Sequence, residues 1–531
     1  MPEIRASTGG FAAFPVEPLD EHNRKLLDNV HPAEWSNPAP AGRYHLVVVG
    51  AGTAGLVSAA GAAGLGARVA LVERHLMGGD CLNVGCVPSK AVIRAARAWQ
   101  EAREASEKFG GPATVGAENF ATAMRRMRRL RAGISPHDSA RRFRDELGID
   151  VFLGEGRFVA PDALEVGSAR LAFRRAVIAT GARAAVADVP GLEDVDYRTN
   201  ETIFNLTDLP RRLAVIGGGP IGCEMAQAFA RFGSQVILLH RGSHVLARED
   251  ADAAAIVQDA MIRDGVRLES EAMLLEVRRP GGGSGDKIVV FERGGERRQV
   301  VVEEILVAAG RCPNIEGLGL EAAGVRYSAK GVEVDDRLRS SNPDIFACGD
   351  VASRHQFTHV ADAQARIVIQ NALFMGKAKA SALTIPWCTF TSPEIAHVGL
   401  YERDARARGH AVASLTVPLA EVDRAILDGE EEGFLRVVHE TGSGKILGAT
   451  LVAEHAGDML GELCLAVTAG IALGRLAGVI HPYPTQAEVV KKAADIWRRG
   501  KLTPMVKRLF RLWFRLFPPG WFHRRPAQAK G

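Results

Sequence analysis

The stretch Tyr44-His45-Leu46-Val47-Val48-Val49-Gly50-Ala51-Gly52-Thr53-Ala54-Gly55 decides the fold expected for this chain of 531 residues. Its first half is apolar and β-branched, which predicts a buried parallel strand. Gly50, Gly52 and Gly55 then allow a tight turn and let the backbone approach the pyrophosphate of a dinucleotide at the N-terminus of the next helix. We expect that helix over Leu56 to Gly66.

The same pattern recurs later in the chain. Leu213-Ala214-Val215-Ile216 predicts a strand, and Gly217, Gly219 and Gly222 follow it with the same spacing. One glycine turn of this kind is weak evidence. Two of them, each between a strand and a helix, predict two dinucleotide-binding domains.

The residue that follows the next strand differs between the two repeats. Glu73 stands 23 residues after the first glycine of the first turn, where a carboxylate can hydrogen-bond ribose hydroxyls. His240 stands 23 residues after the first glycine of the second turn, with Arg241 beside it and no acid within 235–247. Cations there suit a 2′-phosphate, which a carboxylate would repel. We therefore expect FAD at the first site and NADPH at the second.

Two cysteines follow the first turn in the segment Gly78-Gly79-Asp80-Cys81-Leu82-Asn83-Val84-Gly85-Cys86-Val87-Pro88-Ser89-Lys90. Such a thiol pair beside a bound flavin can pass two electrons. A zinc site would need two further ligands, and no second cysteine pair exists in the chain. The seven cysteines are an odd, sparse set, which argues for reduced thiols in a cytosol and against a secreted disulfide framework.

This segment resembles the active-site segment of the FAD-dependent pyridine nucleotide–disulfide oxidoreductases, and the sequence around it is most similar to the mercuric reductase-like branch. The resemblance covers about residues 43 to 500. It includes segments similar to the family's ATG, GRxPN and GD motifs and the segment that closes over the isoalloxazine. The cofactor-binding residues that it implies, besides the glycines of the two turns, are Glu73, Gly79, Asp80, Lys90, Thr180, Gly181, His240, Arg241, Gly310, Gly349, Asp350 and His359.

The resemblance also implies catalytic roles. Cys86 would face the flavin as a thiolate, and a helix beginning near it would favour that charged form. Cys81 would be the outward thiol that meets the acceptor. Lys90 would lie near the flavin, paired with Glu224 just past the second turn, and its ammonium would stabilise negative charge on the ring.

The C-terminal part departs from the disulfide-reducing members of the family. Those members carry His-x-His-Pro-Thr, whose second histidine exchanges a proton with the outward thiol of the other subunit. Here the segment runs from His481 to Glu488, and Tyr483 takes the place of that base. Tyr483 and Glu488 are its candidate catalytic residues. A phenol with an ordinary pKa of about 10 is a poor base at neutral pH, so efficient reduction of a bulky disulfide is not expected. Tyrosine at this place resembles mercuric reductase, although that enzyme's N-terminal Cys-x-x-Cys domain and vicinal C-terminal cysteines are missing.

The expected fold is α/β, with two Rossmann-like domains of the glutathione reductase type and a C-terminal α+β dimerisation domain, assembled as a homodimer. The expected division begins with an N-terminal extension (1–42) and the first half of the FAD domain with the redox disulfide (43–198). An NAD(P)H domain (199–316) and the second half of the FAD domain (317–384) follow. The dimerisation domain (385–500) and a basic amphipathic tail (501–531) complete the chain.

The charge of the chain is concentrated in its tail. Ten Lys and Arg and no acid lie within 496–531, while the net charge of the chain is only +4, so nucleic acid is not an expected partner. Within 505–517 the basic residues share one helical stripe and most of the apolar ones lie opposite, a pattern typical of a helix at a membrane interface. Two alternatives remain open: peripheral membrane contact, or packing of this helix on its own dimer. With no signal peptide in the sequence, the expected location is the cytoplasm, with association at the inner face of the membrane under the first alternative.

The predicted function is electron transfer from NADPH through FAD to a Cys81–Cys86 disulfide, and from there to a small-molecule or metal-ion acceptor, as in mercuric reductase. The alternatives are a dihydrolipoamide dehydrogenase-like activity, a quinone or electrophile reductase at the membrane face, and a membrane-surface flavoprotein without turnover.

Overall fold

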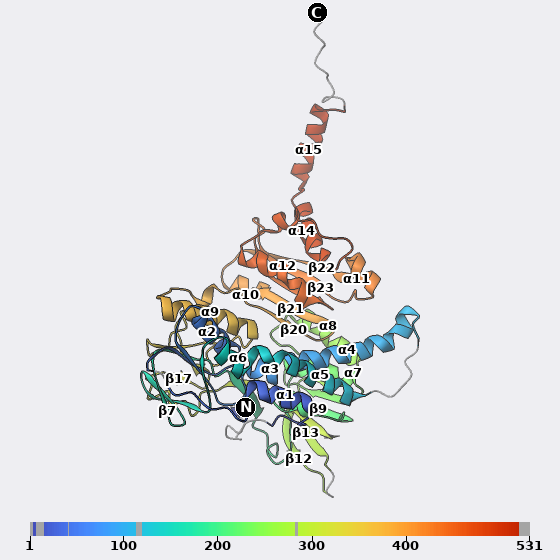
Figure 1. The fold of residues 1–531 in the computed structure, drawn as a ribbon. Coiled ribbons are helices and arrows are strands. Elements are labelled where there is room, and N and C mark those ends of the chain that lie inside the picture. Colours follow the sequence, from blue (N-terminus) through green and yellow to red (C-terminus); the bar gives the residue numbers. More distant parts are fainter. Residues whose placement is uncertain (1–3, 7–14, 41, 113–118, 282–284, 520–531) are drawn as a thin grey trace, which may run out of the picture. The chain divides into compact units, whose positions relative to one another are not determined.

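The computed structural model describes residues 4–6, 15–40, 42–112, 119–281 and 285–519 (Figure 1). The chain divides into two compact units, which are described separately. The first comprises Met1–Ile385 with Thr389–Ser392, and the second Pro386–Cys388 with Pro393–Gly531.

A seven-stranded sheet forms the centre of the first unit. Its strands are β4 (Asp150–Leu153), β3 (Val69–Glu73), β2 (Tyr44–Val49), β7 (Ala169–Ile178), β6 (Ala163–Val166), β5 (Gly156–Ala160) and β19 (Ile345–Ala347). The pairs β4–β3, β3–β2, β2–β7 and β7–β19 are parallel, whereas β5 and β6 add an antiparallel extension. The predicted strand at Tyr44 is therefore central, and all of its side chains except that of His45 are buried.

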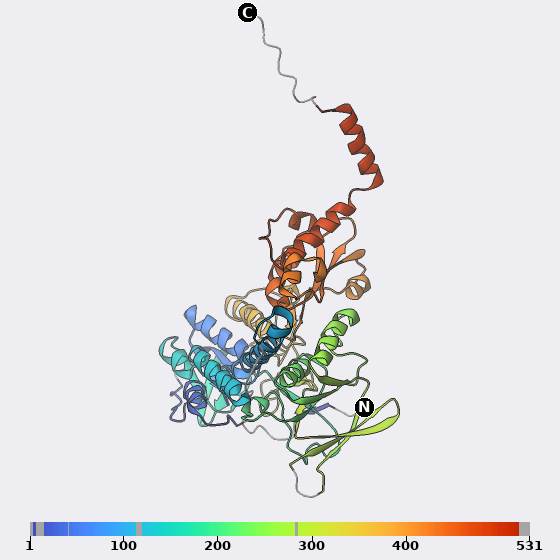
Figure 2. The ribbon, with the colours of Figure 1, turned by 90° about the vertical axis from the view of Figure 1, so that its right-hand side faces the viewer.

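A second parallel sheet in the same unit carries the second glycine turn. Its strand order is β11 (Val266–Glu269), β10 (Gln235–Leu239), β9 (Arg212–Ile216), β15 (Glu304–Val307). Helices α7 (Pro220–Arg231) and α8 (Ala251–Arg263) belong to this domain. An antiparallel sheet of β12 (Met273–Arg278), β13 (Lys287–Arg293) and β14 (Glu296–Val302) follows, drawn in yellow-green in Figure 2.

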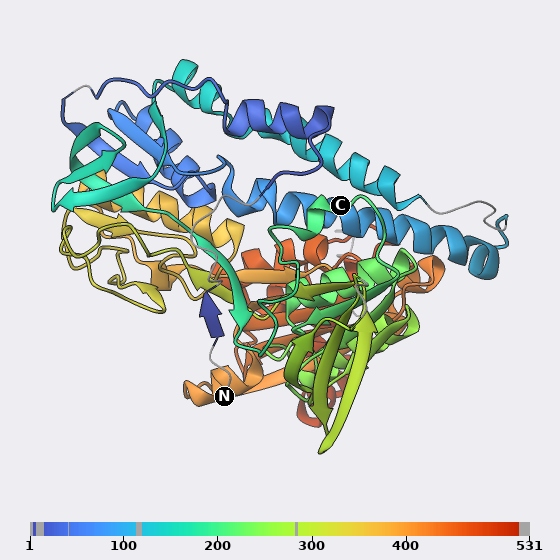
Figure 3. The same cartoon turned by 90° about the horizontal axis from the view of Figure 1, so that it is seen from below.

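Helices cover the first sheet. They are α1 (Glu21–Val30), α2 (Thr53–Gly64), α3 (Gly79–Asn83), α4 (Cys86–Phe109), α5 (Phe120–Ile134), α6 (Ala140–Asp145) and α9 (Thr358–Phe374). Figure 3 shows α1, α5 and α4 side by side, and α2 packs on α9. Residues of the N-terminal extension are held by this layer: Asp20 pairs with Arg128 at 2.6 Å, and Asn23 accepts a hydrogen bond of 2.7 Å from Arg131. In the described part of the extension, the chain thus covers the first domain.

Short strands and turns join these layers. They are β1 (Ile4–Ala6), β8 (Ala182–Ala187) and β16 (Arg311–Pro313) in one small sheet, β17 (Tyr327–Ser328) and β18 (Gly331–Val332) in another, and the 3-10 turns η1 (Ser135–Asp138), η2 (Ile203–Asn205) and η3 (Ala380–Ala382). Strand β16 pairs with β8 so that Cys312 lies opposite Arg183. This pairing holds the GRxPN-like segment next to the strand that follows Thr180.

The second unit is built on a five-stranded sheet. Its strand order is β20 (Pro386–Thr389), β21 (Glu394–Gly399), β24 (Ile446–Ala453), β23 (Phe434–Glu440), β22 (Val412–Pro418). Its other elements are α10 (Glu402–Ala407), η4 (Leu419–Glu421), α11 (Asp423–Asp428), α12 (Ala456–Thr468), α13 (Leu473–Leu476), α14 (Glu488–Gly500) and α15 (Pro504–Leu516). Among the described residues, no helix combines the length and the apolar character that crossing a bilayer requires, and the uncharged run at 46–67 folds as β2, α2 and the turn after them.

Candidate active site

The first glycine turn has a backbone that only glycine can form. Gly50 has φ +99°, and a Cβ there would lie 2.4 Å from the carbonyl oxygen of Ala179. A Cβ on Gly55 would lie 1.8 Å from the carbonyl oxygen of Gly50. Because α2 begins at Thr53, directly after this turn, its N-terminal backbone amides are placed to receive a pyrophosphate.

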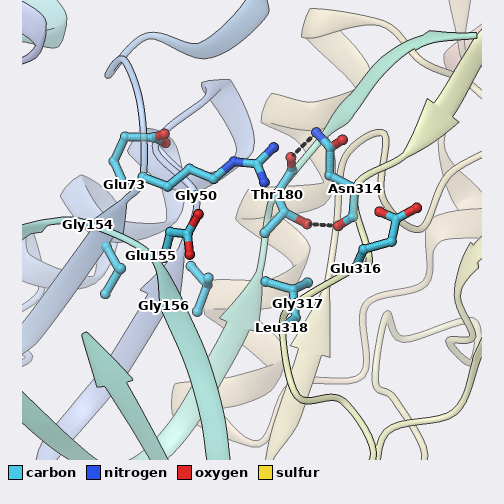
Figure 4. A pocket seen from close by; sticks show the side chains of 13 residues that line it. Gly50, Glu73, Gly154, Glu155, Gly156, Thr180, Asn314, Glu316, Gly317 and Leu318 are labelled. Atoms are coloured by element: carbon cyan, nitrogen blue, oxygen red, sulfur yellow. Dashed lines mark hydrogen bonds between the residues drawn. The ribbon is translucent and has the colours of Figure 1, made fainter. Parts of the chain in front are cut away.

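A pocket opens beside this turn (Figure 4). It is lined by Val49, Gly50, Val72, Glu73, Arg74, Gly154, Glu155, Gly156, Thr180, Asn314, Glu316, Gly317 and Leu318. Thr180 and Asn314 join its two sides: the Thr180 hydroxyl donates to the Asn314 carbonyl at 2.7 Å, and the Asn314 amide donates to the Thr180 carbonyl at 2.9 Å. A glycine-lined pocket beside a helix N-terminus, with a carboxylate in its wall, fits the nucleotide half of FAD.

Glu73 also fixes the turn itself. One carboxylate oxygen accepts the backbone N–H of Ala51 at 2.6 Å and the other accepts that of His75 at 2.7 Å. Burial raises the pKa of Glu73, and the two backbone hydrogen bonds oppose that rise. Since each carboxylate oxygen has a second lone pair, these contacts leave Glu73 able to accept from ribose hydroxyls.

The thiol segment packs directly against this turn. A Cβ on Gly79, which has φ +55°, would lie 2.6 Å from the Cα of Gly52. This approach requires glycine at position 79, whereas a Cβ on Gly52 would make an ordinary contact of 3.7 Å with the Cα of Gly79. The contact places α3, which carries Cys81, and the N-terminus of α4, where Cys86 is the first residue, beside the dinucleotide turn.

The two thiols have different acidities. The hydrogen bond between them raises the pKa of Cys81, as does burial, and it lowers the pKa of Cys86. Cys86 Sγ lies 3.2 Å from the Thr358 hydroxyl, which, with the charge of Lys90, lowers its pKa further. These shifts favour the charged form at Cys86 and the protonated form at Cys81, and both are free cysteines in this structure.

Lys90 forms the ion pair that the resemblance implies. It lies one turn after Cys86 on α4, and its Nζ is 2.9 Å from a carboxylate oxygen of Glu224 on α7. The other oxygen of Glu224 accepts the backbone N–H of Phe390 at 3.0 Å, and the Lys90 ammonium lies 4.5 Å from the centroid of the Phe390 ring. Glu224 is only 5% exposed, so the carboxylate is fixed and the lysine is held by it.

Arg311 is a site residue that the sequence analysis did not single out. Its guanidinium pairs with Asp80, lies 3.5 Å from Asp350 and donates to the Ala182 carbonyl at 2.8 Å. Burial opposes the charge of Arg311, but the two carboxylates outweigh it and raise its pKa. Burial raises the pKa of Asp350 to about 6. Arg311 therefore joins Asp80 and Asp350. Its position directly after Gly310 in the GRxPN-like segment is the sequence feature from which this role could have been inferred.

The second glycine turn repeats the geometry of the first. Gly217 has φ +115°, a Cβ there would lie 2.3 Å from the Ala308 carbonyl oxygen, and one on Gly222 would lie 1.9 Å from the Gly217 carbonyl oxygen. A Cβ on Gly219 would meet no atom within 4 Å, so space remains above this turn. The turn leads into α7, whose first residue is Pro220.

His240 has the structural position of Glu73 in this second turn. Its Nδ1 accepts the backbone N–H of Gly218 at 3.2 Å, as Glu73 accepts that of Ala51. Burial lowers the pKa of His240, so the ring is neutral at neutral pH. The lone pair of Nδ1 accepts the hydrogen bond from the turn, and the neighbouring Arg241 is exposed.

Of the remaining predicted residues, His359 directly follows Thr358, which contacts Cys86, and the others named below lie in the second unit. The His359 ring stacks on Phe357, with centroids 5.4 Å apart. In the second unit, Tyr483 is 69% exposed and donates a hydrogen bond of 2.8 Å to Asp423, which raises the pKa of Tyr483. His481 lies 3.0 Å from Glu462, and Glu488 begins α14. Within the described residues no cluster of His, Cys, Asp and Glu has the arrangement of a metal site.

Comparisons with known proteins define the class. The model of the pyridine nucleotide–disulphide oxidoreductase family matches residues 44–365, and the model of that family's dimerisation domain matches residues 385–494. The chain belongs to the pyridine nucleotide–disulphide oxidoreductases, a family of FAD-dependent enzymes that use a pyridine nucleotide. The dimerisation domain supports a homodimer.

Individual relatives place the chain near the mercuric reductase branch. Mercuric reductase of Streptomyces lividans is 37% identical over 85% of this chain and 96% of its own length, and that of Bacillus cereus is 35% identical over 85% and 71%. Dihydrolipoyl dehydrogenase of Geobacillus stearothermophilus is 33% identical over 85% of this chain and 95% of its own length. Among solved structures, the HOCl-induced flavoprotein disulfide reductase RclA from Escherichia coli has a TM-score of 0.76 and 28% identity, covering 85% of this chain and 99% of its own.

Proposed function

We propose that this flavoprotein takes electrons from NADPH and delivers them through the Cys81–Cys86 pair to a soft metal ion or a small electrophile. The observation that carries the proposal is the position of Cys86 at the N-terminus of α4, 3.2 Å from the Thr358 hydroxyl and one turn before the Lys90–Glu224 ion pair, surroundings that lower the pKa of Cys86. The first glycine turn and Glu73 would hold FAD, which would supply two-electron transfer between the nicotinamide and the Cys81–Cys86 disulfide. Lys90 then supplies fixed positive charge, and Arg311 with Asp80 and Asp350 holds the backbone at the first nucleotide site.

The acceptor is argued from the softness of the thiols. Thiolates select soft metal ions, and relatives of this chain include mercuric reductases and an RclA structure that is a Cu(II) complex. One NADPH supplies two electrons, which reduce one Hg(II) to Hg(0) or two Cu(II) to Cu(I). The test is NADPH oxidation by the purified holoenzyme with Hg(II), Cu(II), menadione, lipoamide or no acceptor. Turnover with lipoamide that exceeds turnover with every metal ion and electrophile would contradict the proposal.

The second candidate function is a dihydrolipoamide dehydrogenase-like activity, which the 33% identity to dihydrolipoyl dehydrogenase favours. Tyr483 is the residue that argues against it. Because its pKa is raised, Tyr483 has even less phenolate at neutral pH than an ordinary tyrosine and is less available as a base. Replacing it by histidine (Tyr483→His) should increase lipoamide reduction by about tenfold or more, because a positioned base contributes about 10²–10⁴-fold. Steady-state rates with lipoamide and with Hg(II) measure the change.

The control Tyr327→His alters an exposed tyrosine of the first unit and should change neither rate. If the wild-type rate with lipoamide already equals that of Tyr483→His, Tyr483 does not limit this reaction.

Arg241 is the proposed determinant for NADPH over NADH, since His240 is neutral and occupied by the turn. Arg241→Ala should lower kcat/KM for NADPH by about 10- to 100-fold, the range of one charge-assisted hydrogen bond, and leave that for NADH nearly unchanged. Arg297→Ala removes an exposed arginine from β14 of the same domain and is the matched control. Equal use of the two nucleotides by the wild-type protein would refute this assignment.

A further inference from the structure

Helix α15 presents an unpartnered surface near the end of the chain. It spans Pro504–Leu516, begins after Thr503, whose side chain accepts the backbone N–H of Val506 at 3.3 Å, and has no buried side chain. It is the C-terminal helix in red that follows α14 (Figure 2). A helix of this length, about 20 Å, is marginally stable alone in water, so its stability calls for a surface that binds its apolar face.

The helix has two distinct faces. At 100° per residue, the four basic side chains fall within about 100° of arc, and the apolar ones fill the opposite arc of about 200°. The basic residues are Lys507, Arg508, Arg511 and Arg515. The large apolar side chains, which are between 51% and 70% exposed, are Met505, Leu509, Phe510, Leu512, Trp513, Phe514 and Leu516.

The aromatic residues and the charge indicate the chemistry of the occupant. Trp513 lies 4.3 Å from Phe517 between ring centroids, so the C-terminal end of the apolar face is aromatic. Tryptophan and phenylalanine are typical of helices at the boundary between headgroups and acyl chains. The sequence over 496–531 has ten Lys and Arg and no acid, so this segment is attracted to a surface with a dense negative charge.

A second copy of the same helix fits this charge less well. Pairing two copies through their apolar faces would turn the basic stripe of each copy away from the other, so the charge of the stripe would contribute nothing to that association. An anionic lipid surface removes the apolar face from water and neutralises the basic stripe at the same time. It satisfies both faces of the helix.

We propose that α15 lies in the interface of an anionic membrane, with its apolar arc in the acyl boundary and Lys507, Arg508, Arg511 and Arg515 among the headgroups. The helix would attach the reductase to the membrane surface without spanning it. This inference concerns only the attachment and does not depend on the acceptor.

The test is sedimentation of the full-length, FAD-loaded protein with vesicles. Phosphatidylcholine vesicles that contain phosphatidylglycerol should pellet the protein, and vesicles of phosphatidylcholine alone should not. Lys507→Gln with Arg511→Gln should weaken binding by about 25-fold, because each basic side chain near an anionic surface contributes about fivefold. Trp513→Ser with Phe514→Ser should weaken it by more than about tenfold through lost apolar burial. Arg211→Gln with Arg297→Gln removes the same charge from exposed positions of the first unit and should leave binding unchanged.

Each other outcome overturns the proposal. Equal binding to neutral and anionic vesicles would remove the role of the basic stripe. Absence of vesicle binding, with association beyond the homodimer that Trp513→Ser and Phe514→Ser abolish, would assign the face to a second copy of the helix. NADPH oxidation with the acceptor should be the same in all variants, because none of these residues belongs to the nucleotide or thiol site, and this activity confirms that each variant is folded.

Discussion

Replacing Cys86 by serine should lower NADPH-driven acceptor reduction by at least about 10³-fold, since the serine hydroxyl cannot form a disulfide with Cys81 or act as the thiolate. The two-electron-reduced protein should also lose the long-wavelength absorbance that a thiolate gives beside oxidised flavin. Stopped-flow spectra after one equivalent of NADPH measure the band, and steady-state rates measure turnover. Cys464→Ser, which changes a partly buried cysteine in α12 of the second unit, is the control and should retain both. Acceptor reduction by Cys86→Ser at the wild-type rate would refute the thiol relay.

The pH dependence of the same band checks the thiolate assignment. The pKa of Cys86 is lowered by its hydrogen bond to Cys81, by Thr358 and by Lys90, so the thiolate should persist below the ordinary thiol range and be lost as pH falls through the lowered pKa. Thr358→Val removes the hydroxyl 3.2 Å from the sulfur and should move the loss of the band to higher pH. An unchanged or lower midpoint in Thr358→Val would show that this hydroxyl does not stabilise the thiolate.

Replacing Lys90 by methionine should slow reduction of the flavin by NADPH by about 10²- to 10³-fold, the cost of removing one fixed electrostatic stabiliser from a site where charge develops. Glu224 acts as a positioning residue, so Glu224→Gln should have a smaller effect and Lys90→Arg should recover part of the rate. Single-turnover flavin reduction under anaerobic conditions measures these rates.

The chain offers a matched control for the Lys90 variant. Lys108 lies on the same helix and pairs with Glu104 at 2.8 Å on an exposed face, so Lys108→Met removes an equivalent ion pair away from the thiols. It should leave flavin reduction unchanged. If Lys90→Met and Lys108→Met have the same rate, Lys90 has no special role in the reaction.

The helix that begins at Cys86 was expected from the resemblance to a family, whereas local sequence patterns predicted the two strand–turn–helix repeats. They did so because the glycines at 50, 55, 217 and 222 are required by backbone contacts within or next to each turn. The Lys90–Glu224 pair joins residues 134 positions apart and could be inferred only through the resemblance to a family. Periodicity alone carries no information about such a contact.

The contacts that were not anticipated depend on tertiary packing. Arg311 reaches Asp80 across 231 positions, and Thr358 reaches Cys86 across 272, so no local spacing relates them. His240 was expected to offer a cation together with Arg241. Burial and the hydrogen bond from the Gly218 amide leave its ring neutral, and neither can be read from the identity of the residue.

The contact between Gly52 and Gly79 has a consequence for the geometry of the site. With no side chain between them, the backbone that receives the pyrophosphate and the backbone that carries the sulfurs touch directly. A Cβ at position 79 would lie 2.6 Å from the Cα of Gly52, so any side chain there would push the two segments apart. The spacing between the sulfurs and the nucleotide is therefore set by the smallest residue the chain can place at position 79.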